Sequence, residues 1–270
     1  MSHWWERPRV NRLSAVVITL NEERSLPRTL DSVSWCDEIV VLDSGSSDRT
    51  VEIAQSYPNC RVVTQPFLGY GLQKRKAVAE ASNDWILSVD ADEVLDAGLQ
   101  RSLQAWRLSG SAGSAGYYLL RRLCFMGREF RHGRESRDRV LRLFDRRRGN
   151  FTSARIHERV EVEGATETLD GRLLHYTYRD LEEYFDKFNR YTSVMAREMH
   201  GRRRRPSTLA MALRPPVTFL QYYFLHGNWL NGFPGYVWSC LAAGYRTVKY
   251  LKFYELETAA TRPDETHSTD

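Results

Sequence analysis

The chain of 270 residues is long enough for one large domain with an extension, and its 42% hydrophobic share is typical of a folded protein. Its formal net charge of +5 is only moderately basic, which does not by itself indicate a nucleic-acid-binding protein. The four cysteines are widely scattered and form no CxxC pair. This spacing argues against a zinc site or a disulfide framework, and it fits a reducing compartment.

The first half of the chain alternates strand-like and helix-like segments. The strand-like runs are rich in β-branched residues and bounded by polar ones, and the helix-like segments carry apolar residues three and four apart. The expected strands are 13–20, 38–43, 60–64 and 85–89, and the expected helices are 22–34, 48–56 and 72–81. This order predicts an α/β fold with a doubly wound, mainly parallel sheet and right-handed crossovers.

Two aspartates, Asp90 and Asp92, follow the expected strand at 85–89. Open parallel sheets bind ligands beyond the carboxyl ends of their strands, which is where these carboxylates fall. Mg²⁺ is usually held by one or two carboxylates, with substrate phosphates completing its shell. The pattern indicates a divalent metal with a sugar nucleotide, whereas a solvated turn with acidic helix caps is the structural alternative.

Three motifs at successive strand ends carry a resemblance to a known family. They are residues 19–23 after the first strand, 43–50 after the second and 90–92 after the fourth. In this order they resemble the family 2 inverting glycosyltransferases of the GT-A fold, over roughly the first half of the chain. Further matches at 69–74, 84–85, 90–93 and 157–158 look like the lipopolysaccharide core glucosyltransferases that add a β-linked glucose to the inner-core heptose.

The resemblance implies a UDP-sugar donor and a divalent metal, Mg²⁺ or Mn²⁺. The implied nucleotide-sugar ligands are Thr19, Asn21, Glu22, Asp43, Gln73, Lys74 and Asp90. Asp43 matches the acid that binds the uracil, Asp90 is implied on the ribose side, and Asp92 is implied at the metal. An Asx-type turn or a helix cap is the structural alternative for Asp43, and a solvated basic side chain is the alternative for Lys74.

Two further residues in the second half are candidates. His175 lies in an apolar strand-like run at 172–176, a region from which many GT-A enzymes take a histidine to complete the metal shell. A hydrogen-bonded structural histidine is the alternative. An inverting transfer needs a general base, for which a carboxylate is suited, and the resemblance makes Glu158, in an expected strand beginning at residue 156, the candidate. A surface ion pair is its alternative, and Asp138, Asp145 and Glu93 are rivals.

Arginines crowd the stretch from 121 to 148, interleaved with phenylalanine and leucine. Arginine binds phosphates and carboxylates in bidentate geometry, and an inner-core lipopolysaccharide acceptor is rich in both. A nucleic-acid patch is a competing interpretation, but no nucleic-acid-binding motif accompanies the arginines, so no nucleic acid is expected. A plain solvated surface also remains open.

The C-terminal third predicts helices at a membrane surface. Residues 180–199 have the spacing of an amphipathic helix, and the apolar, aromatic stretches 209–225 and 229–245 follow a run of four arginines. Both stretches are interrupted by proline, so neither offers the ~20 uninterrupted apolar residues of a spanning helix. We expect peripheral attachment to an anionic leaflet, with a soluble helical subdomain or a dimer interface as the alternative.

These observations together predict a catalytic domain at 1–178, with a nucleotide-binding half at 13–95 and an acceptor half at 96–178. A helical extension at 179–257 and a disordered tail at 258–270 follow. Residues 1–9 lack a continuous apolar core, so no secretory signal is expected, and the location is cytoplasmic, on the inner face of the cytoplasmic membrane.

The expected activity is inverting transfer of a hexose, glucose from UDP-glucose, to the inner-core heptose of lipopolysaccharide or another lipid-linked glycan. A sugar-nucleotide nucleotidyltransferase is one alternative, although the chain has no glycine-rich basic loop after the first strand. A non-catalytic membrane- or polyanion-binding protein is the other, although such a protein has no need for acids at strand ends.

Overall fold

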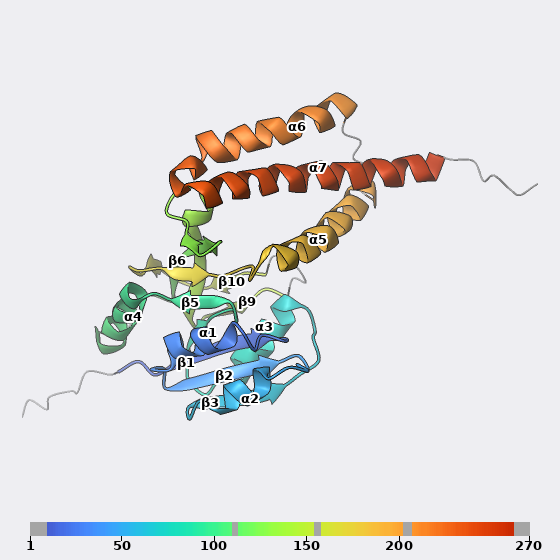
Figure 1. Cartoon of the computed structure of the whole chain (residues 1–270). Coiled ribbons are helices and arrows are strands. Elements are labelled where there is room, and N and C mark those ends of the chain that lie inside the picture. The colour runs from blue at the N-terminus through green and yellow to red at the C-terminus, as the bar shows by residue number, and fades with distance from the viewer. Residues whose placement is uncertain (1–9, 110–112, 154–157, 202–206, 262–270) are drawn as a thin grey trace, which may run out of the picture. The chain divides into compact units, whose positions relative to one another are not determined.

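The computed structural model describes residues 10–109, 113–153, 158–201 and 207–261 (Figure 1). The chain divides into two compact units. Residues 1–124 and 135–177 form the first, which we call the sheet unit, and residues 125–134 and 178–270 form the second, which we call the helical unit.

Four parallel strands form the first part of the sheet, in the order β3-β2-β1-β4. Their bounds are β1 (Leu13–Thr19), β2 (Glu38–Asp43), β3 (Cys60–Thr64) and β4 (Trp85–Ser88). The connecting helices are α1 (Leu26–Val33), α2 (Thr50–Gln55) and α3 (Tyr70–Glu80). The carboxyl ends of β1, β2 and β4 therefore lie along one edge of the sheet, as ligand binding in an open parallel sheet requires.

The sheet continues from β4 in the order β8-β6-β12-β5. β8 (Asp138–Asp145) is antiparallel to β4 and to β6 (Gly116–Phe125), whereas β12 (Leu173–His175) is parallel to β6 and antiparallel to β5 (Glu93–Leu95). The smaller elements of the unit are α4 (Ala97–Ser109), β9 (Gly149–Phe151), β10 (Val160–Val162) and β11 (Thr166–Thr168). The chain thus leaves β4 in the middle of the sheet and enters β5 at its edge.

Apolar side chains cover both faces of the parallel strands. Leu13, Ala15 and Val17 of β1 belong to one buried cluster, and Val16 belongs to a second cluster with residues of α3. Strands that are buried on both faces need apolar residues at every position rather than at alternate ones. This burial explains why β1 and β2 appear in the sequence as largely apolar runs, whereas β3, at the end of the sheet, is less buried.

The helical unit consists mainly of α5 (Leu181–Gly201), α6 (Thr208–Leu220) and α7 (Phe233–Thr261), with α7 packed against both other helices. A hairpin formed by the end of β6 and β7 (Arg128–Glu129) belongs to the same unit. A π-helical turn (Gln221–Leu225) and a 3₁₀ turn (Asn228–Asn231) connect α6 to α7. Within the described ranges, no helix is both long and apolar enough to cross a membrane.

The predicted α/β class with a C-terminal helical extension is confirmed. Two details of the C-terminal part differ from expectation. Pro215 and Pro216 interrupt the apolar run but lie inside α6, which continues through both. Residues 258–261, expected in the disordered tail, are the last turn of α7, and the rest of that tail lies outside the described residues.

The strand expected to begin at residue 156 begins at Val160 instead. Residues 154–157, including His157 of the predicted motif, lie outside the described residues. The unit boundary falls at 177/178, beside the expected boundary at 178/179, and the arginine-rich segment 125–134 groups with the helices.

Candidate functional site

The turn after β2 is organised by Asp43, whose side chain is almost fully buried. One carboxylate oxygen accepts hydrogen bonds from the hydroxyls of Thr19, at 3.1 Å, and Ser46. The other accepts from the backbone N–H groups of Gly45 and Ser46, each at 2.9 Å. Gly45 has φ +96°, which favours glycine. The Asx-type turn considered as an alternative for Asp43 is therefore present, and it fixes this acid beside the end of β1.

The loop after β1 is tied to the loop after β2. Asn21 has a φ of 57°, and its backbone N–H donates to the Ser46 hydroxyl at 2.8 Å. The side-chain oxygen of Asn21 accepts from the backbone N–H of Ser47, also at 2.8 Å. The backbone N–H of Glu22 donates to Thr50 Oγ1 at 2.7 Å. The strand-end residues predicted to line one pocket therefore lie in two loops that hold each other in place.

Gln73 supports the same region from α3. Its amide nitrogen donates to Ser44 Oγ and to the carbonyl of Gln65, both at 3.1 Å, and its amide oxygen accepts from the backbone of Leu68 at 3.2 Å. The side chain is fully buried. These bonds occupy Gln73 in bracing the 65–68 segment.

Lys74, the next residue, joins two acids that are far apart in the sequence. Its ammonium group lies 2.7 Å from Asp90 Oδ1 and 2.9 Å from Glu158 Oε1. Only 5% of the Lys74 side chain is exposed. A buried ammonium group needs such partners because its desolvation is costly. Asp90 and Glu158 therefore share one cation.

Arg142, on β8, completes the charged cluster. One of its nitrogens, Nη2, lies 2.5 Å from Asp90 Oδ2 and 2.7 Å from Glu93 Oε1. Glu93 is fully buried and also contacts Arg121 at 3.1 Å, and its second oxygen accepts the backbone N–H of Asp90 at 3.0 Å. Glu93 is thus held as a structural counter-ion, which weakens its case as a rival base.

The cluster shifts the pKa values of its members. Burial by itself would raise the pKa of Asp90, but the charges of Arg142 and Lys74 outweigh burial and hold it far below its ordinary range. Burial would lower the pKa of Arg142, and the charges of Asp90 and Glu93 raise it instead. Asp90 is therefore a permanent carboxylate at neutral pH.

Asp92 and His175 form a separate pair beside this cluster. His175 Nε2 lies 3.3 Å from Asp92 Oδ2, because β12 pairs with β5 so that His175 lies opposite Glu93. Its Nδ1 is 3.1 Å from Thr177 Oγ1. Burial lowers the pKa of His175, and the charge and hydrogen bond of Asp92 more than reverse this effect.

The pair fits the expected metal in donor chemistry. One carboxylate and one imidazole nitrogen converge, and Mg²⁺ or Mn²⁺ accepts such ligands together with phosphate oxygens. Among the described residues no group of three or more His, Cys, Asp or Glu side chains could hold a metal without further ligands. Asp92 and His175 would supply two ligands at most, which leaves positions for water or for phosphate oxygens of a substrate.

Sequence reasoning missed Arg142 as an individual residue, although it included the surrounding arginine-rich stretch. A signal was available, because an arginine within the apolar strand Val140–Phe144 must find a buried partner. The other rival bases are engaged elsewhere. Asp145 lies opposite Trp85, at the amino end of β4 and away from Asp90, and Asp138 pairs with Arg121.

The sequence profile described as glycosyl transferase family 2 matches residues 14–157. The chain belongs to this family. The lipopolysaccharide core biosynthesis glycosyltransferase LpsC of Rhizobium meliloti is 33% identical over 258 residues, covering 93% of this chain and 95% of LpsC. An uncharacterised glycosyltransferase of Rickettsia bellii is 30% identical over 91% of this chain and 87% of its own length.

Among solved structures, glucosyl-3-phosphoglycerate synthase from Mycobacterium tuberculosis, in complex with Mn²⁺, UDP and phosphoglyceric acid, is 28% identical over 42% of this chain and 44% of that chain, with a TM-score of 0.36. Family membership confirms the predicted enzyme class. The family 2 protein is a glycosyltransferase, and the nucleotidyltransferase and non-catalytic alternatives are set aside.

Proposed function

We propose that this family 2 glycosyltransferase transfers glucose from UDP-glucose, with inversion, to a heptose of the lipopolysaccharide inner core. The observation that carries the proposal is the shared contact of Lys74 with Asp90 and Glu158, which brings a donor-side acid and a candidate base to one point. The 33% identity to a lipopolysaccharide core biosynthesis glycosyltransferase supports the acceptor class.

Asp92 and His175 would hold Mg²⁺ or Mn²⁺ on the donor side. A bound divalent ion supplies positive charge that stabilises the departing diphosphate. Asp90 is assigned to the ribose, and Asp43, Thr19, Asn21 and Glu22 to the nucleoside, where a wrong base leaves buried polar groups unpaired. In the ligand-free chain Asp43 is occupied by its turn, so its role would be to shape the pocket as well as to contact the base.

Glu158 is the proposed general base. Its carboxylate lies 2.9 Å from the Lys74 ammonium group, and a carboxylate is the kind of group that can accept the proton of an acceptor hydroxyl. The donor diphosphate would offer Lys74 another anionic partner, which would weaken the ion pair between Lys74 and Glu158. The acceptor hydroxyl then loses its proton to Glu158 as its oxygen bonds to the anomeric carbon, while the bond from that carbon to UDP breaks.

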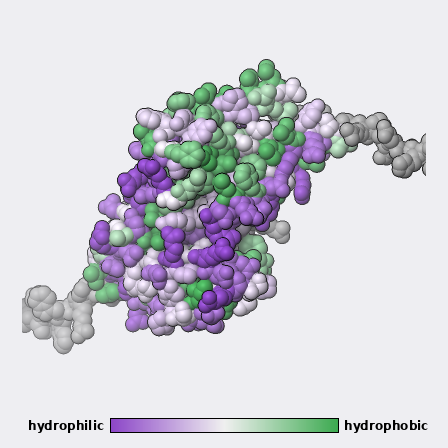
Figure 2. All heavy atoms as spheres, in the orientation of Figure 1, coloured by the Kyte–Doolittle hydropathy of each residue, from purple (hydrophilic) through white to green (hydrophobic). Residues whose placement is uncertain are grey.

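The helical unit is proposed to attach the enzyme to the inner face of the cytoplasmic membrane, where a lipid-linked acceptor is available. Exposed apolar side chains on α6 support this proposal, including Leu209, Leu213, Val217 and Leu220. Figure 2 shows hydrophobic side chains gathered over the α6 and α7 region. Aromatic and basic side chains together suit the headgroup region of an anionic leaflet.

The test is release of UDP from a panel of UDP-sugars, with and without Mg²⁺ or Mn²⁺, using heptose-containing deep-rough lipopolysaccharide as the acceptor. We expect one sugar to turn over only with acceptor and metal present. Turnover with other acceptors but not with this one would overturn the acceptor assignment.

Two variants test the roles. Glu158→Gln should leave UDP-sugar binding nearly unchanged and reduce transfer by about 10²–10⁴-fold, since it removes only proton transfer. Asp92→Asn should abolish the stimulation by metal. Glu161→Gln, which removes an exposed acid on the neighbouring strand β10, is the matched control and should keep full activity. Equal loss of binding and transfer in Glu158→Gln would demote Glu158 to a structural residue.

A further inference from the structure

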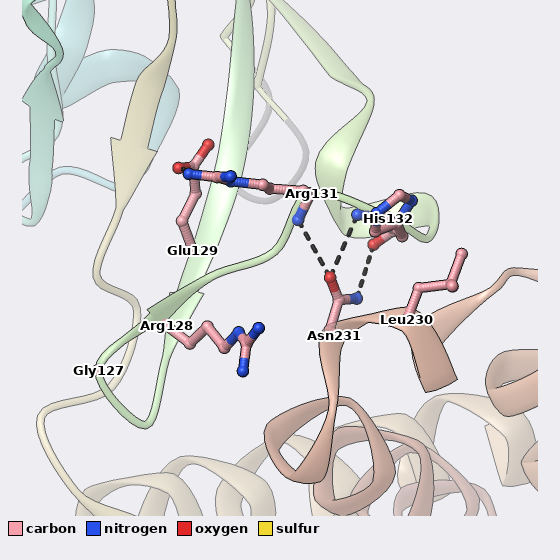
Figure 3. A pocket seen from close by; sticks show the side chains of 7 residues that line it. All are labelled: Gly127, Arg128, Glu129, Arg131, His132, Leu230 and Asn231. Atoms are coloured by element: carbon pink, nitrogen blue, oxygen red, sulfur yellow. Dashed lines mark hydrogen bonds and ion pairs between the residues drawn. The ribbon is translucent and has the colours of Figure 1, made fainter.

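A cavity of about 430 Å³ lies within the helical unit, and none of the candidate site residues of the sheet unit lines it. It is lined by Gly127, Arg128, Glu129, Arg131, His132, Leu230 and Asn231 (Figure 3). One wall is the hairpin that follows β6, and the other is the 3₁₀ turn before α7. We call it the hairpin pocket.

Asn231 fixes the two walls of the hairpin pocket together. Its side-chain oxygen accepts from the backbone N–H groups of Arg131, at 3.1 Å, and His132, at 3.2 Å. Its amide nitrogen donates to the His132 carbonyl at 2.9 Å. The Asn231 side chain is buried, and Figure 3 shows its three bonds to the hairpin segment. The pocket is therefore built by contacts between segments about a hundred residues apart, and its shape does not depend on one loop.

The side chains of the hairpin pocket carry excess positive charge. Within the described part of the chain, the Arg128 guanidinium has no hydrogen bond or ion pair. Arg131 is 73% exposed, and its distance to Glu129 is 3.6 Å, too long for a strong charge-assisted hydrogen bond. Glu129 is the one acid in the lining, set against two arginines and a histidine. Guanidinium groups suit phosphate because they donate two parallel hydrogen bonds to it.

Exposed apolar side chains adjoin the same pocket in the sequence and the fold. Met126 precedes the hairpin turn, Trp229 and Leu230 belong to the 3₁₀ turn, and Phe233 begins α7, and all four are exposed. A site for free phosphate has no use for such neighbours. A site for a phosphate that carries acyl chains does, because aromatic and aliphatic side chains beside arginines suit the boundary between headgroups and hydrocarbon.

We propose that the hairpin pocket binds the phosphate headgroup of an anionic lipid within a bilayer. Arg128 and Arg131 donate to the phosphate, His132 adds a donor, and Leu230 and Trp229 contact the start of the acyl chains. This proposal rests on the membrane attachment included in the proposed function. It adds which residues bind the membrane and which class of lipid they bind.

The test compares binding of the full chain to phosphatidylcholine vesicles with and without 20% phosphatidic acid, by co-sedimentation at a fixed salt concentration. The pocket variant is Arg128→Gln with Arg131→Gln. The control is Arg190→Gln with Arg197→Gln, which removes two exposed arginines of α5 and therefore the same net charge. We expect the pocket variant to lose about 30-fold in partitioning to the acidic vesicles, from roughly five- to sixfold for each arginine at an anionic surface.

The control variant should lose clearly less, because its arginines lie outside the pocket. An equal loss in both variants would mean that only overall charge matters, and it would overturn the proposal. Two further arms identify the source of the phosphate. Inorganic phosphate at millimolar concentration should not displace the protein from vesicles, and Leu230→Ser should weaken vesicle binding. Displacement by inorganic phosphate together with no effect of Leu230→Ser would assign the pocket to a free anion and refute the lipid.

UDP release with a detergent-dispersed acceptor separates this inference from the proposed function. The pocket variant should retain its kcat at saturating acceptor there, since neither arginine is assigned to the donor, the metal or the base. A chain that binds acidic vesicles through the pocket but turns over no UDP-sugar would leave the lipid site standing and refute the proposed function.

Discussion

Replacing Arg142 with glutamine should destabilise the protein strongly. Arg142 is almost fully buried and contacts both Asp90, at 2.5 Å, and Glu93, at 2.7 Å, through the same nitrogen. Removing one partner of a buried ion pair typically costs 3–5 kcal/mol, because the remaining charge stays desolvated. Here Asp90 keeps Lys74 and Glu93 keeps Arg121, so we expect a loss near the lower limit, about 3 kcal/mol.

Urea unfolding at pH 7, followed by circular dichroism, measures this loss. Arg139→Gln on the same strand is the control, because Arg139 is exposed, and we expect it to change the free energy of unfolding by less than about 0.5 kcal/mol. Adding Glu93→Gln to Arg142→Gln should recover part of the stability, since it removes the stranded charge. A loss below about 1 kcal/mol in Arg142→Gln, or no recovery in the double variant, would refute the reasoning that Arg142 neutralises buried acids.

Other substitutions test neighbouring features. Lys74→Met should raise the KM for the UDP-sugar by about tenfold or more in initial-rate assays, because it removes a cation beside Asp90, and an unchanged KM would contradict a donor role. Gln73→Leu should lower the free energy of unfolding by about 1–3 kcal/mol in urea titrations, since it removes the three hydrogen bonds of a buried amide. A neutral result would show that water replaces the amide. Burial would raise the pKa of Glu183, but hydrogen bonds from Arg179 and Lys187 lower it to about 2 in the folded chain. The stabilisation by the ionised Glu183 should thus be complete above the ordinary pKa of a glutamate and disappear as the pH falls toward 2. The melting temperatures of wild type and Glu183→Gln should therefore converge in acid. A difference that stays constant with pH would contradict the lowered pKa of Glu183.

The sequence predicts the parallel half of the sheet well because its signals are local. The buried strands β1, β2 and β4 are largely apolar runs, and each is followed by polar residues that mark a turn. Asp43, Asp90 and Asp92 were therefore placed at strand ends correctly from sequence alone. The resemblance contributed Glu158 and His175, which lie outside those local patterns, and their catalytic and metal-binding roles stay predictions.

The missed features depend on contacts between distant segments. Arg142 reaches Asp90 only because β8 returns antiparallel beside β4, and no local pattern specifies that register. The segment 125–134 groups with the helices through contacts such as those of Asn231, about a hundred residues away. The continuation of α6 through Pro215 and Pro216 shows in another way that tertiary context can override local preference.

The shared ammonium group of Lys74 has a consequence for evolution and for engineering. Asp90 and Glu158 both contact the Lys74 ammonium group, so a substitution of either acid changes the electrostatic surroundings of the other. Variants of Asp90 and Glu158 should therefore behave as a pair whose combined effect differs from the sum of the single effects. A change of sugar specificity pursued one position at a time would miss combinations in which both acids, or Lys74 itself, adjust together.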